Sequence, residues 1–264
     1  MALVRRLTTE QKRGIGHWAM ELVIVIGGVL IALWLQQWGE RRQAQRNLAL
    51  AEEAIHDELR ETLKSLIWRE SIKQCHADRI KLLKSALVAP RIEWPGLEEN
   101  ALWLVPPKGM IGTESIISSV YWRPLDTFTD AAWRSALATG TLAPMDRKRF
   151  ALLVNAYDQI QFLRDTRDRE TAATERLAAL TFPMRLTPEV RSDMLQGLYV
   201  LDRSRFTFAL IGPSTVAGWM RELGWNDRAE FDRYLVDDAK EVKAVGLVWR
   251  PCVAKSRNPF IATQ

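Results

Sequence analysis

The feature that most constrains this sequence is an uncharged, apolar stretch close to the N-terminus. Residues 22–35 read LVIVIGGVLIALWL and contain no charged side chain. Because an α-helix rises about 1.5 Å per residue, a helix over residues 18–38 would be about 30 Å long, which is the thickness of the hydrocarbon core of a bilayer. We therefore expect a transmembrane helix over residues 18–38, preceded by a short tail of residues 1–17.

The ends of this segment carry residues that anchor a helix at a membrane surface. Trp18 stands at one end and Trp34 and Trp38 stand at the other, which is the spacing of the two aromatic belts of a spanning helix. Arg41 and Arg42 follow directly. These flanks favour a membrane span over the alternative, a buried core helix.

Two features inside the segment need an interpretation. Glu21 lies about one turn inside the first belt, with His17 four residues earlier on the same helix face. Because an acid so near the interface can reach water or pair with histidine, we interpret it as an anchor residue rather than a proton or ion carrier. Gly28 and Ala32 are a candidate helix-dimer face, since small residues four apart allow close approach; chance explains such a pair equally well.

The positive charge of the chain is concentrated around this segment. Residues 1–46 hold seven basic and three acidic side chains, which accounts for +4 of the formal net charge of +5. A nucleic-acid-binding domain would instead carry its basic excess on the folded surface. We therefore expect the membrane bilayer, and not a nucleic acid, to be the partner of the basic residues.

The flanking charges also predict the orientation. Basic flanks remain in the cytoplasm, and long domains cross the membrane largely regardless of charge. No small-x-small cleavage site follows the apolar stretch, so we expect an anchor that is not removed as a signal peptide. The prediction is a bacterial inner-membrane protein with residues 1–17 in the cytoplasm and residues 39–264 in the periplasm.

The anchor resembles a family of known topology. Residues 21–33 and the exit at residues 36–41 combine an acid, a glycine-containing apolar run ending Ile-Ala-Leu, a polar pair, Trp38 and a Glu-Arg step into a long helix. This pattern is similar to the N-terminus of a bacterial family of uncharacterised, single-pass membrane-anchored proteins, a domain of unknown function.

A second stretch resembles the same family. Residues 129–142 look like a helix that ends at Gly140, and a further helix carrying Tyr157 follows; the family has an aromatic pair where this chain has one aromatic residue. The two matches cover residues 20–70 and 113–165. The resemblance implies an anchor and a helical extracytoplasmic domain, and it implies no activity.

The rest of the chain predicts an all-α domain that resembles a helical bundle. Residues 41–88 contain neither proline nor glycine, and their apolar residues recur at intervals of three and four, so we expect one long helix there. A coiled-coil stalk that pairs two chains is an alternative, but the heptad pattern is lost after Arg69, which favours a bundle. Helices are expected again over residues 126–246, followed by an irregular tail over residues 247–264.

Local signals mark two of these later helices. Thr127, with Asp130 three residues on, is similar to a capping box and predicts a helix start. Thr187 followed by Pro188 predicts an N-cap with proline at the first helical position. No alternating pattern typical of β-strands occurs.

The connection over residues 89–125 is expected to be irregular, because five of the eleven prolines lie within it. It also holds a set of aromatic residues that we consider a candidate binding surface: Trp94, Trp103, Tyr121 and Trp122. The alternative, which we favour, is that these rings pack the connection onto the bundle.

Residues that carry chemistry are sparse. His56 and His76 would lie about 30 Å apart on one helix and could not share a metal ion. No zinc-protease, nucleophile-elbow, phosphate-loop or Cys-x-x-Cys motif occurs, so we expect no catalytic residue, no metal and no cofactor. Cys75 and Cys252 are a candidate disulfide in an oxidising compartment, with two buried free thiols as the default interpretation.

The run of charged residues at 164–170 is typical of a solvated helix surface. Arg164 and Asp168, and likewise Asp165 and Arg169, are four residues apart, which is the spacing of ion pairs on an exposed helix face. We therefore expect no functional role for this run.

Three functions of different classes remain open. The leading hypothesis is a non-enzymatic anchored protein whose periplasmic helical domain binds a protein partner or a second copy, or scaffolds an envelope assembly. The second is a sensor domain that binds a small molecule of unknown identity through the aromatic connection. The third is an envelope enzyme that uses Asp and Glu for acid–base chemistry.

Overall fold

The computed structural model describes the backbone of residues 9–97, 120–121, 128–244 and 257–261, and the side chains of these residues except 9–19 and 237–244. The described part is all-α apart from two very short strands. Its helices are α1 (Thr9–Val88), α2 (Ala131–Ala138), α3 (Arg147–Leu177), the 3-10 helix η3 (Ala178–Thr181), α4 (Pro188–Leu210), α5 (Pro213–Glu222) and α6 (Arg228–Ala244).

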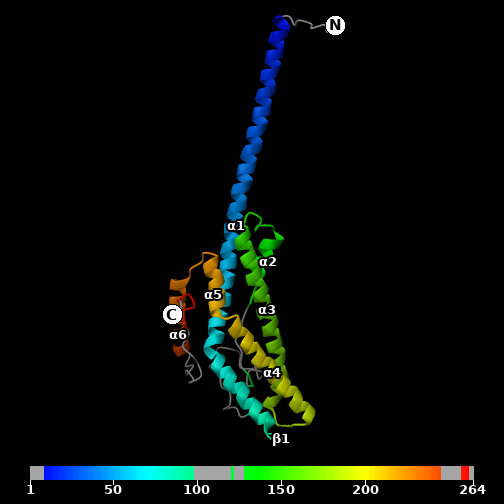
Figure 1. Ribbon diagram of the computed structural model, residues 1–264, viewed down its shortest axis with the longest axis vertical. Helices are drawn as coiled ribbons and strands as arrows, with labels where there is room; N and C mark the ends of the chain where they lie inside the picture. Colours follow the sequence, from blue (N-terminus) through cyan, green and yellow to red (C-terminus); the bar gives the residue numbers. More distant parts are fainter. Residues whose placement is uncertain (1–8, 98–119, 122–127, 245–256, 262–264) are drawn as a thin grey trace.

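Helix α1 dominates the architecture. Its 80 residues form a rod about 120 Å long, and its N-terminal half stands clear of every other element (Figure 1). The C-terminal half lies within a bundle, where α2, α4 and α5 pack on it and α3 packs on α4 and α5. The apolar segment and the long polar helix are therefore one continuous helix.

The end of α1 is fixed by proline and by an arginine from another helix. Pro90 follows Val88 by two residues and prevents the helix from continuing. Arg191 of α4 then donates to three carbonyl oxygens at and just beyond the helix end: those of Leu87, of Ala89 at 2.9 Å and of Arg91 at 2.7 Å. This arginine ties the two helices together at the end of the bundle that is far from the N-terminus.

The starts of the later helices follow local side-chain caps. The hydroxyl of Thr187 accepts a hydrogen bond from the backbone of Val190, with Pro188 at the first helical position, as the sequence predicted. The prediction of a capping box at Thr127 was wrong, because α2 begins at Ala131 with Asp130 as its N-cap. The N-terminus of α2 is satisfied by a side chain from α1 together with Thr129, as described below.

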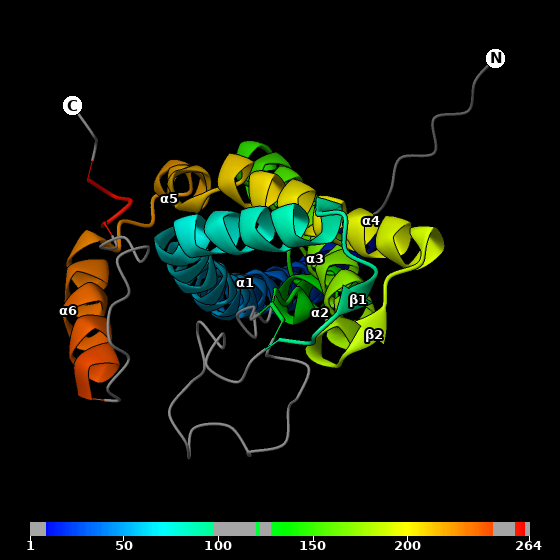
Figure 2. The ribbon, with the colours of Figure 1, turned by 90° about the horizontal axis from the view of Figure 1, so that it is seen from below.

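A short antiparallel pair of strands was not predicted. β1 (Glu93–Trp94) pairs with β2 (Met184–Arg185), with Trp94 opposite Met184. Two residues per strand are too few to show an alternating pattern. The ribbon viewed from below shows this pair beside the start of α4 (Figure 2).

The core consists of two apolar clusters along α1. The first surrounds the middle of the helix, where the stripe predicted from the sequence meets α2, α3, α5 and α6; its α1 members are Ile55, Leu59, Leu63, Leu66 and Ile67. The second lies toward the strands and joins α1 to α3 and α4; its α1 members are Ile80, Leu83 and Leu87. No residue of α1 before Ile55 is buried within the described side chains, but Leu48 and Ala51 already pack against the first cluster, so the bundle begins near Leu48.

Candidate functional site

The apolar segment of α1 is exposed along its whole length. The large apolar side chains between Met20 and Trp38 are between 49% and 68% exposed, and none of the most apolar window, whose mean hydropathy is 1.8, is buried in the fold. Soluble monomers rarely expose apolar patches larger than a few hundred Å². Among the described residues this is the one helix long and apolar enough to cross a membrane.

The predicted anchor residues lie at the surface of this helix. Trp34 is 64% and Trp38 is 51% exposed, and the guanidinium of Arg42 lies 5.0 Å from the centre of the Trp38 ring. Arg41 is exposed beside it. The side chain of Trp18 is outside the described residues. At its exit end the helix therefore presents an aromatic ring and basic groups together.

The two features inside the segment are also open to the surroundings. Glu21 is exposed, and the side chain of His17, with which we expected it to pair, is outside the described residues. Gly28 and Ala32 are exposed, and no atom lies within 4 Å of where a Cβ of Gly28 would be. A helix-dimer face at these residues stays a prediction.

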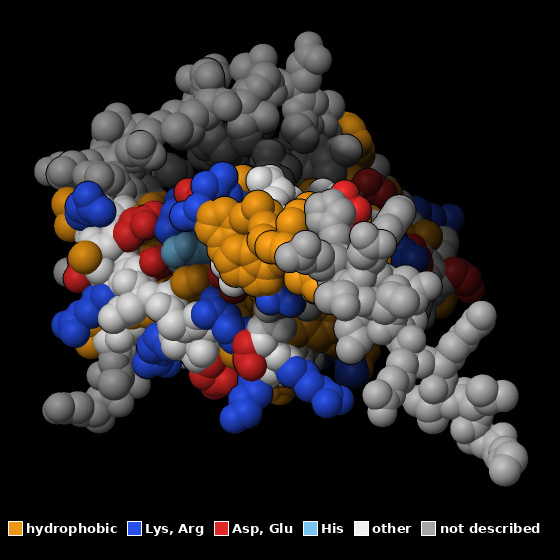
Figure 3. Space-filling view, turned by 90° about the horizontal axis from the view of Figure 1, so that it is seen from above, with side chains coloured by type: hydrophobic (Ala, Val, Ile, Leu, Met, Phe, Trp, Pro, Cys, Tyr) orange, Lys and Arg blue, Asp and Glu red, His pale blue; other side chains and the backbone are white. Residues whose placement is uncertain are grey.

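A polar length of helix separates the apolar segment from the bundle. The 10 residues from Trp38 to Leu48, where packing against the core begins, correspond to about 15 Å of helix. Hydrogen bonds four residues apart, from Gln36 to Glu40 at 2.9 Å and from Gln43 to Asn47 at 3.0 Å, lie along it. Viewed from the N-terminal end, apolar side chains gather in the centre, with basic and acidic side chains mixed around them (Figure 3). The bundle is thus held at a distance by an unbroken helix.

Within the bundle, a buried carboxylate joins α1 to α2 and α3. Glu58 accepts hydrogen bonds from the Tyr157 hydroxyl at 2.7 Å and from the Thr129 hydroxyl at 2.8 Å. It also accepts from the backbone nitrogens of Ala132 and Trp133, at 3.3 and 3.4 Å, and so caps α2 together with the Thr129 hydroxyl, which accepts from Ala131 at 3.2 Å. Burial and the nearby carboxylate raise the pKa of Tyr157 above its ordinary value, which keeps the phenol protonated as the donor. The arrangement is structural.

A second buried carboxylate forms an ion pair in the middle of the bundle. Glu170 of α3 is fully buried and accepts two hydrogen bonds from Arg69 of α1, at 2.8 and 3.2 Å. The Arg69 guanidinium lies 3.7 Å from the centre of the Phe208 ring of α4. Helices α1, α3 and α4 therefore meet at this buried ion pair.

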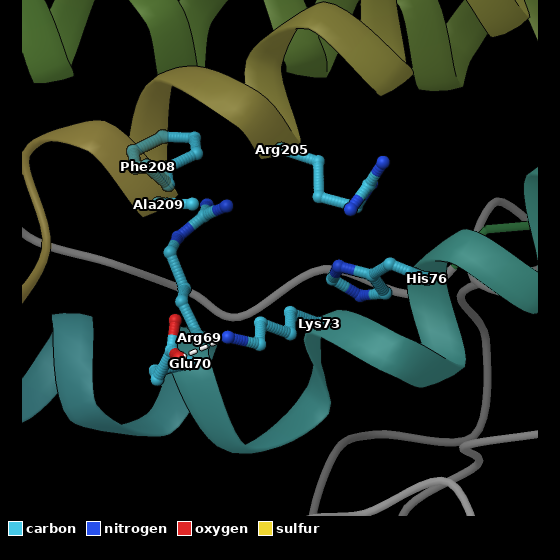
Figure 4. A pocket seen from close by; sticks show the side chains of 7 residues that line it. All are labelled: Arg69, Glu70, Lys73, His76, Arg205, Phe208 and Ala209. Atoms are coloured by element: carbon cyan, nitrogen blue, oxygen red, sulfur yellow. Dashed lines mark hydrogen bonds and ion pairs between the residues drawn. The ribbon is translucent and has the colours of Figure 1, made fainter.

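A small pocket opens beside this ion pair between α1 and α4 (Figure 4). Its lining is Arg69, Glu70, Lys73 and His76 from α1, and Arg205, Phe208 and Ala209 from α4. The enclosed volume is about 10 Å³, which is room for about one water-sized group. Four of the seven side chains are basic in type and one, Glu70, is acidic.

A larger groove lies at the end of the bundle far from the N-terminus. Its volume is about 640 Å³, and it is lined by Ile92, Arg185, Leu186, Thr187, Pro188, Arg191, Ser192 and Leu195. The lining is mainly apolar, carries two arginines and contains no acidic side chain. A groove of this size and composition fits an apolar segment with a negative charge.

A histidine that the sequence left unassigned holds the α5–α6 turn to α1. The Nε2 atom of His56 lies 2.7 Å from the Asp227 carboxylate, and its ring stacks on Trp225 with the centroids 4.7 Å apart. Arg60 contacts Asp227 at 3.3 Å and Glu230 at 3.1 Å. His56 and Asp227 are 171 residues apart, so no local pattern could have indicated the contact.

The aromatic residues of the connection are core residues where they are described. Trp94 is 4% exposed and donates a hydrogen bond to the carbonyl of Leu180 at 2.8 Å. Tyr121 is fully buried, and its ring lies 4.7 Å from that of His76. These two rings pack the connection onto the bundle and are not available as a surface. Trp103 and Trp122 are outside the described residues.

Two other expectations concern cysteine and surface charge. Cys75 is buried and disulfide-bonded, so the default interpretation of two free thiols was wrong. Cys252 is outside the described residues, and its pairing with Cys75 stays a prediction. The interpretation of Arg164 as part of a solvated pair with Asp168 was wrong. Arg164 instead binds Asp130 at 2.7 Å, and the guanidinium holds the pKa of Asp130 below its ordinary value.

Comparisons with known proteins give no further guide to the site. No protein-family model, no curated protein and no solved structure matches the chain. Within the part of the chain that the structure describes, no group of three or more His, Cys, Asp or Glu side chains is placed to hold a metal ion.

Proposed function

We propose that this chain is a single-pass membrane protein whose helical bundle, held away from the bilayer by α1, binds a protein partner. The observation that carries the proposal is the exposed apolar segment that continues without a break into the core of the bundle. The exposure of these side chains supports their burial in the hydrocarbon core of a bilayer. The flanking Trp38, Arg41 and Arg42 support the same arrangement. A bacterial inner membrane with the bundle in the periplasm agrees with the charge of the flanks.

The helix geometry supports a role at a set distance from the membrane. The polar stretch between Trp38 and Leu48 holds the start of the bundle about 15 Å beyond the bilayer edge. The groove lies at the opposite end of the bundle, beside β1 and the start of α4 (Figure 1). A protein that is anchored elsewhere in the envelope could reach that end without touching the bilayer.

The lining of the groove supports one kind of occupant. Ile92, Leu186 and Leu195 offer apolar contact, whereas Arg185 is exposed and no acidic side chain lines the groove. We therefore propose an extended segment of a partner protein that presents apolar side chains next to a carboxylate. Charge complementarity of this kind sets the register and orientation of a bound segment.

The occupant is tested by photo-crosslinking from the full-length chain in native membranes. A benzoylphenylalanine at Ser192, which lines the groove, should give one discrete protein adduct, and Arg185→Glu should abolish that adduct. The control position is Arg203, which is exposed on the same helix and does not line the groove. An adduct that survives Arg185→Glu, or that forms equally from position 203, would contradict the proposal.

The orientation is tested by a reporter fused to the C-terminus. An alkaline phosphatase fusion should be active, because that enzyme requires the oxidising periplasm. A green fluorescent protein fusion, exported to the same side by the general secretion route, should be dark. A dark phosphatase fusion together with a bright fluorescent one would show that the bundle is cytoplasmic.

A further inference from the structure

We propose that the pocket between α1 and α4 binds a compact oxyanion, such as the phosphate or carboxylate group of a small ligand. The two residues that would hold it are Lys73 and Arg205. The site is distinct from the groove at the end of the bundle, and only the exclusion of lipid headgroups as its ligand rests on the membrane span proposed above.

The basic residues of the pocket come from one face of α1 and from Arg205 of the facing helix α4. Arg69, Lys73 and His76 are spaced by four and three residues on α1, so their side chains lie on one side of the helix. Arg205 comes from the facing helix α4 and extends toward the ring of His76 (Figure 4). Phe208, three residues further along α4, closes one wall and lies over Arg69.

The hydrogen bonds inside the site separate fixed groups from adaptable ones. Arg69 uses both terminal nitrogens on the buried Glu170 and is a fixed wall. Arg205 directs Nε and Nη2 to a single oxygen of Asp202, three residues away on the same helix, so its Nη1 atom has no acceptor among the described residues. The Lys73 ammonium carries three protons, and the structure places one carboxylate, that of Glu70, against it.

The pairs that an anion would have to displace are weak ones. The side chains of Lys73 and Glu70 are 48% and 42% exposed, and those of Arg205 and Asp202 are 32% and 53% exposed. Ion pairs at such exposure contribute little to stability. An oxyanion that reaches both cations at once gains two charge-assisted hydrogen bonds, which are stronger than either pair alone.

The size and position of the pocket restrict the ligand. An enclosed volume of about 10 Å³ admits one oxygen of the anion, which is about the size of a water molecule, while the rest of the anion and of the ligand would remain in solvent. Lys73 lies 35 residues beyond Trp38, which is about 50 Å along α1. Lipid headgroups of the anchoring membrane cannot reach the site, so the anion must come from a soluble molecule.

The test is isothermal titration of the full-length chain in a neutral detergent with sodium phosphate and, separately, with sodium acetate, at neutral pH and constant ionic strength. We expect saturable binding of one anion per chain by at least one of the two, and a loss of about tenfold or more in affinity in both Arg205→Gln and Lys73→Gln. The matched controls, Arg203→Gln on α4 and Lys81→Gln on α1, are exposed and have no side-chain partner in the structure, so their affinity should equal that of the unsubstituted chain.

The outcomes decide the proposal in either direction. A preference for phosphate would indicate a phosphorylated ligand, and a preference for acetate would indicate a carboxylate; both support the site. Absence of saturable binding of either anion, or equal weakening in the control variants, would overturn it. Circular dichroism checks the fold of each variant, and Lys73→Gln, which changes a half-exposed side chain, carries the test if Arg205→Gln does not fold.

Discussion

Replacing Glu170 by alanine is expected to lower the free energy of unfolding by about 3–5 kcal/mol. Glu170 is fully buried and accepts both terminal nitrogens of Arg69, whose side chain is 5% exposed. Removal of the carboxylate would leave a guanidinium in the bundle core with neither its counter-charge nor water to solvate it. Urea titration of the full-length chain in detergent, followed by circular dichroism, measures the change.

Two further variants separate this effect from a general loss of side-chain contacts. Glu175→Ala, on the exposed side of the same helix, should change the free energy of unfolding by less than about 0.5 kcal/mol. The double variant Arg69→Met with Glu170→Leu should recover most of the stability, because apolar residues of similar volume commonly replace a buried ion pair without loss. A single variant Glu170→Ala within about 1 kcal/mol of the unsubstituted chain would contradict this account of the core.

The sequence predicted the parts of the fold that local periodicity and helix ends determine. The apolar stripe on α1 follows from residues three and four apart, and the start of α4 follows from Thr187 and Pro188. In both cases the signal lies within one or two helical turns. The all-α class and the long N-terminal helix follow from the same kind of local evidence.

The sequence could not predict contacts between residues that are distant in the chain. Arg69 and Glu170 are 101 residues apart, and the capping of α2 by Glu58 spans 74 residues. The error at Thr127 has this physical cause in part, because two of the three side-chain acceptor contacts at the start of α2 come from Glu58 of α1 and only one comes from the local Thr129. Arg164 was misassigned for the same reason, since its partner Asp130 lies on another segment.

The candidate sites show the same division. The helix that is long and apolar enough to span a membrane could be predicted from the sequence, because hydrophobic length and flanking charge are local properties. The pocket at Lys73 and Arg205 requires the pairing of α1 with α4, and the groove requires the β1–β2 pair, neither of which has a local signature. The sequence offered the aromatic residues of the connection as a candidate binding surface, but Trp94 and Tyr121 are buried in the core.

Charging the apolar segment is expected to have the largest effect of any change in the chain. Ile26 and Val29 are 49% and 53% exposed in the middle of that segment, and an arginine near the centre of a bilayer costs about 2.5–3.5 kcal/mol on insertion scales. The double variant Ile26→Arg with Val29→Arg should therefore fail to integrate. The matched control is Leu50→Arg with Leu82→Arg, which adds the same charges at positions 65% and 54% exposed on the same helix, outside the apolar segment.

Alkaline carbonate extraction of membranes from cells that express these chains tests the membrane anchor most directly. The unsubstituted chain and the Leu50, Leu82 control should stay in the membrane pellet, and the Ile26, Val29 variant should move to the supernatant. Release of the unsubstituted chain by carbonate, or retention of all three chains in the pellet, would contradict the account of α1 as a membrane-spanning helix.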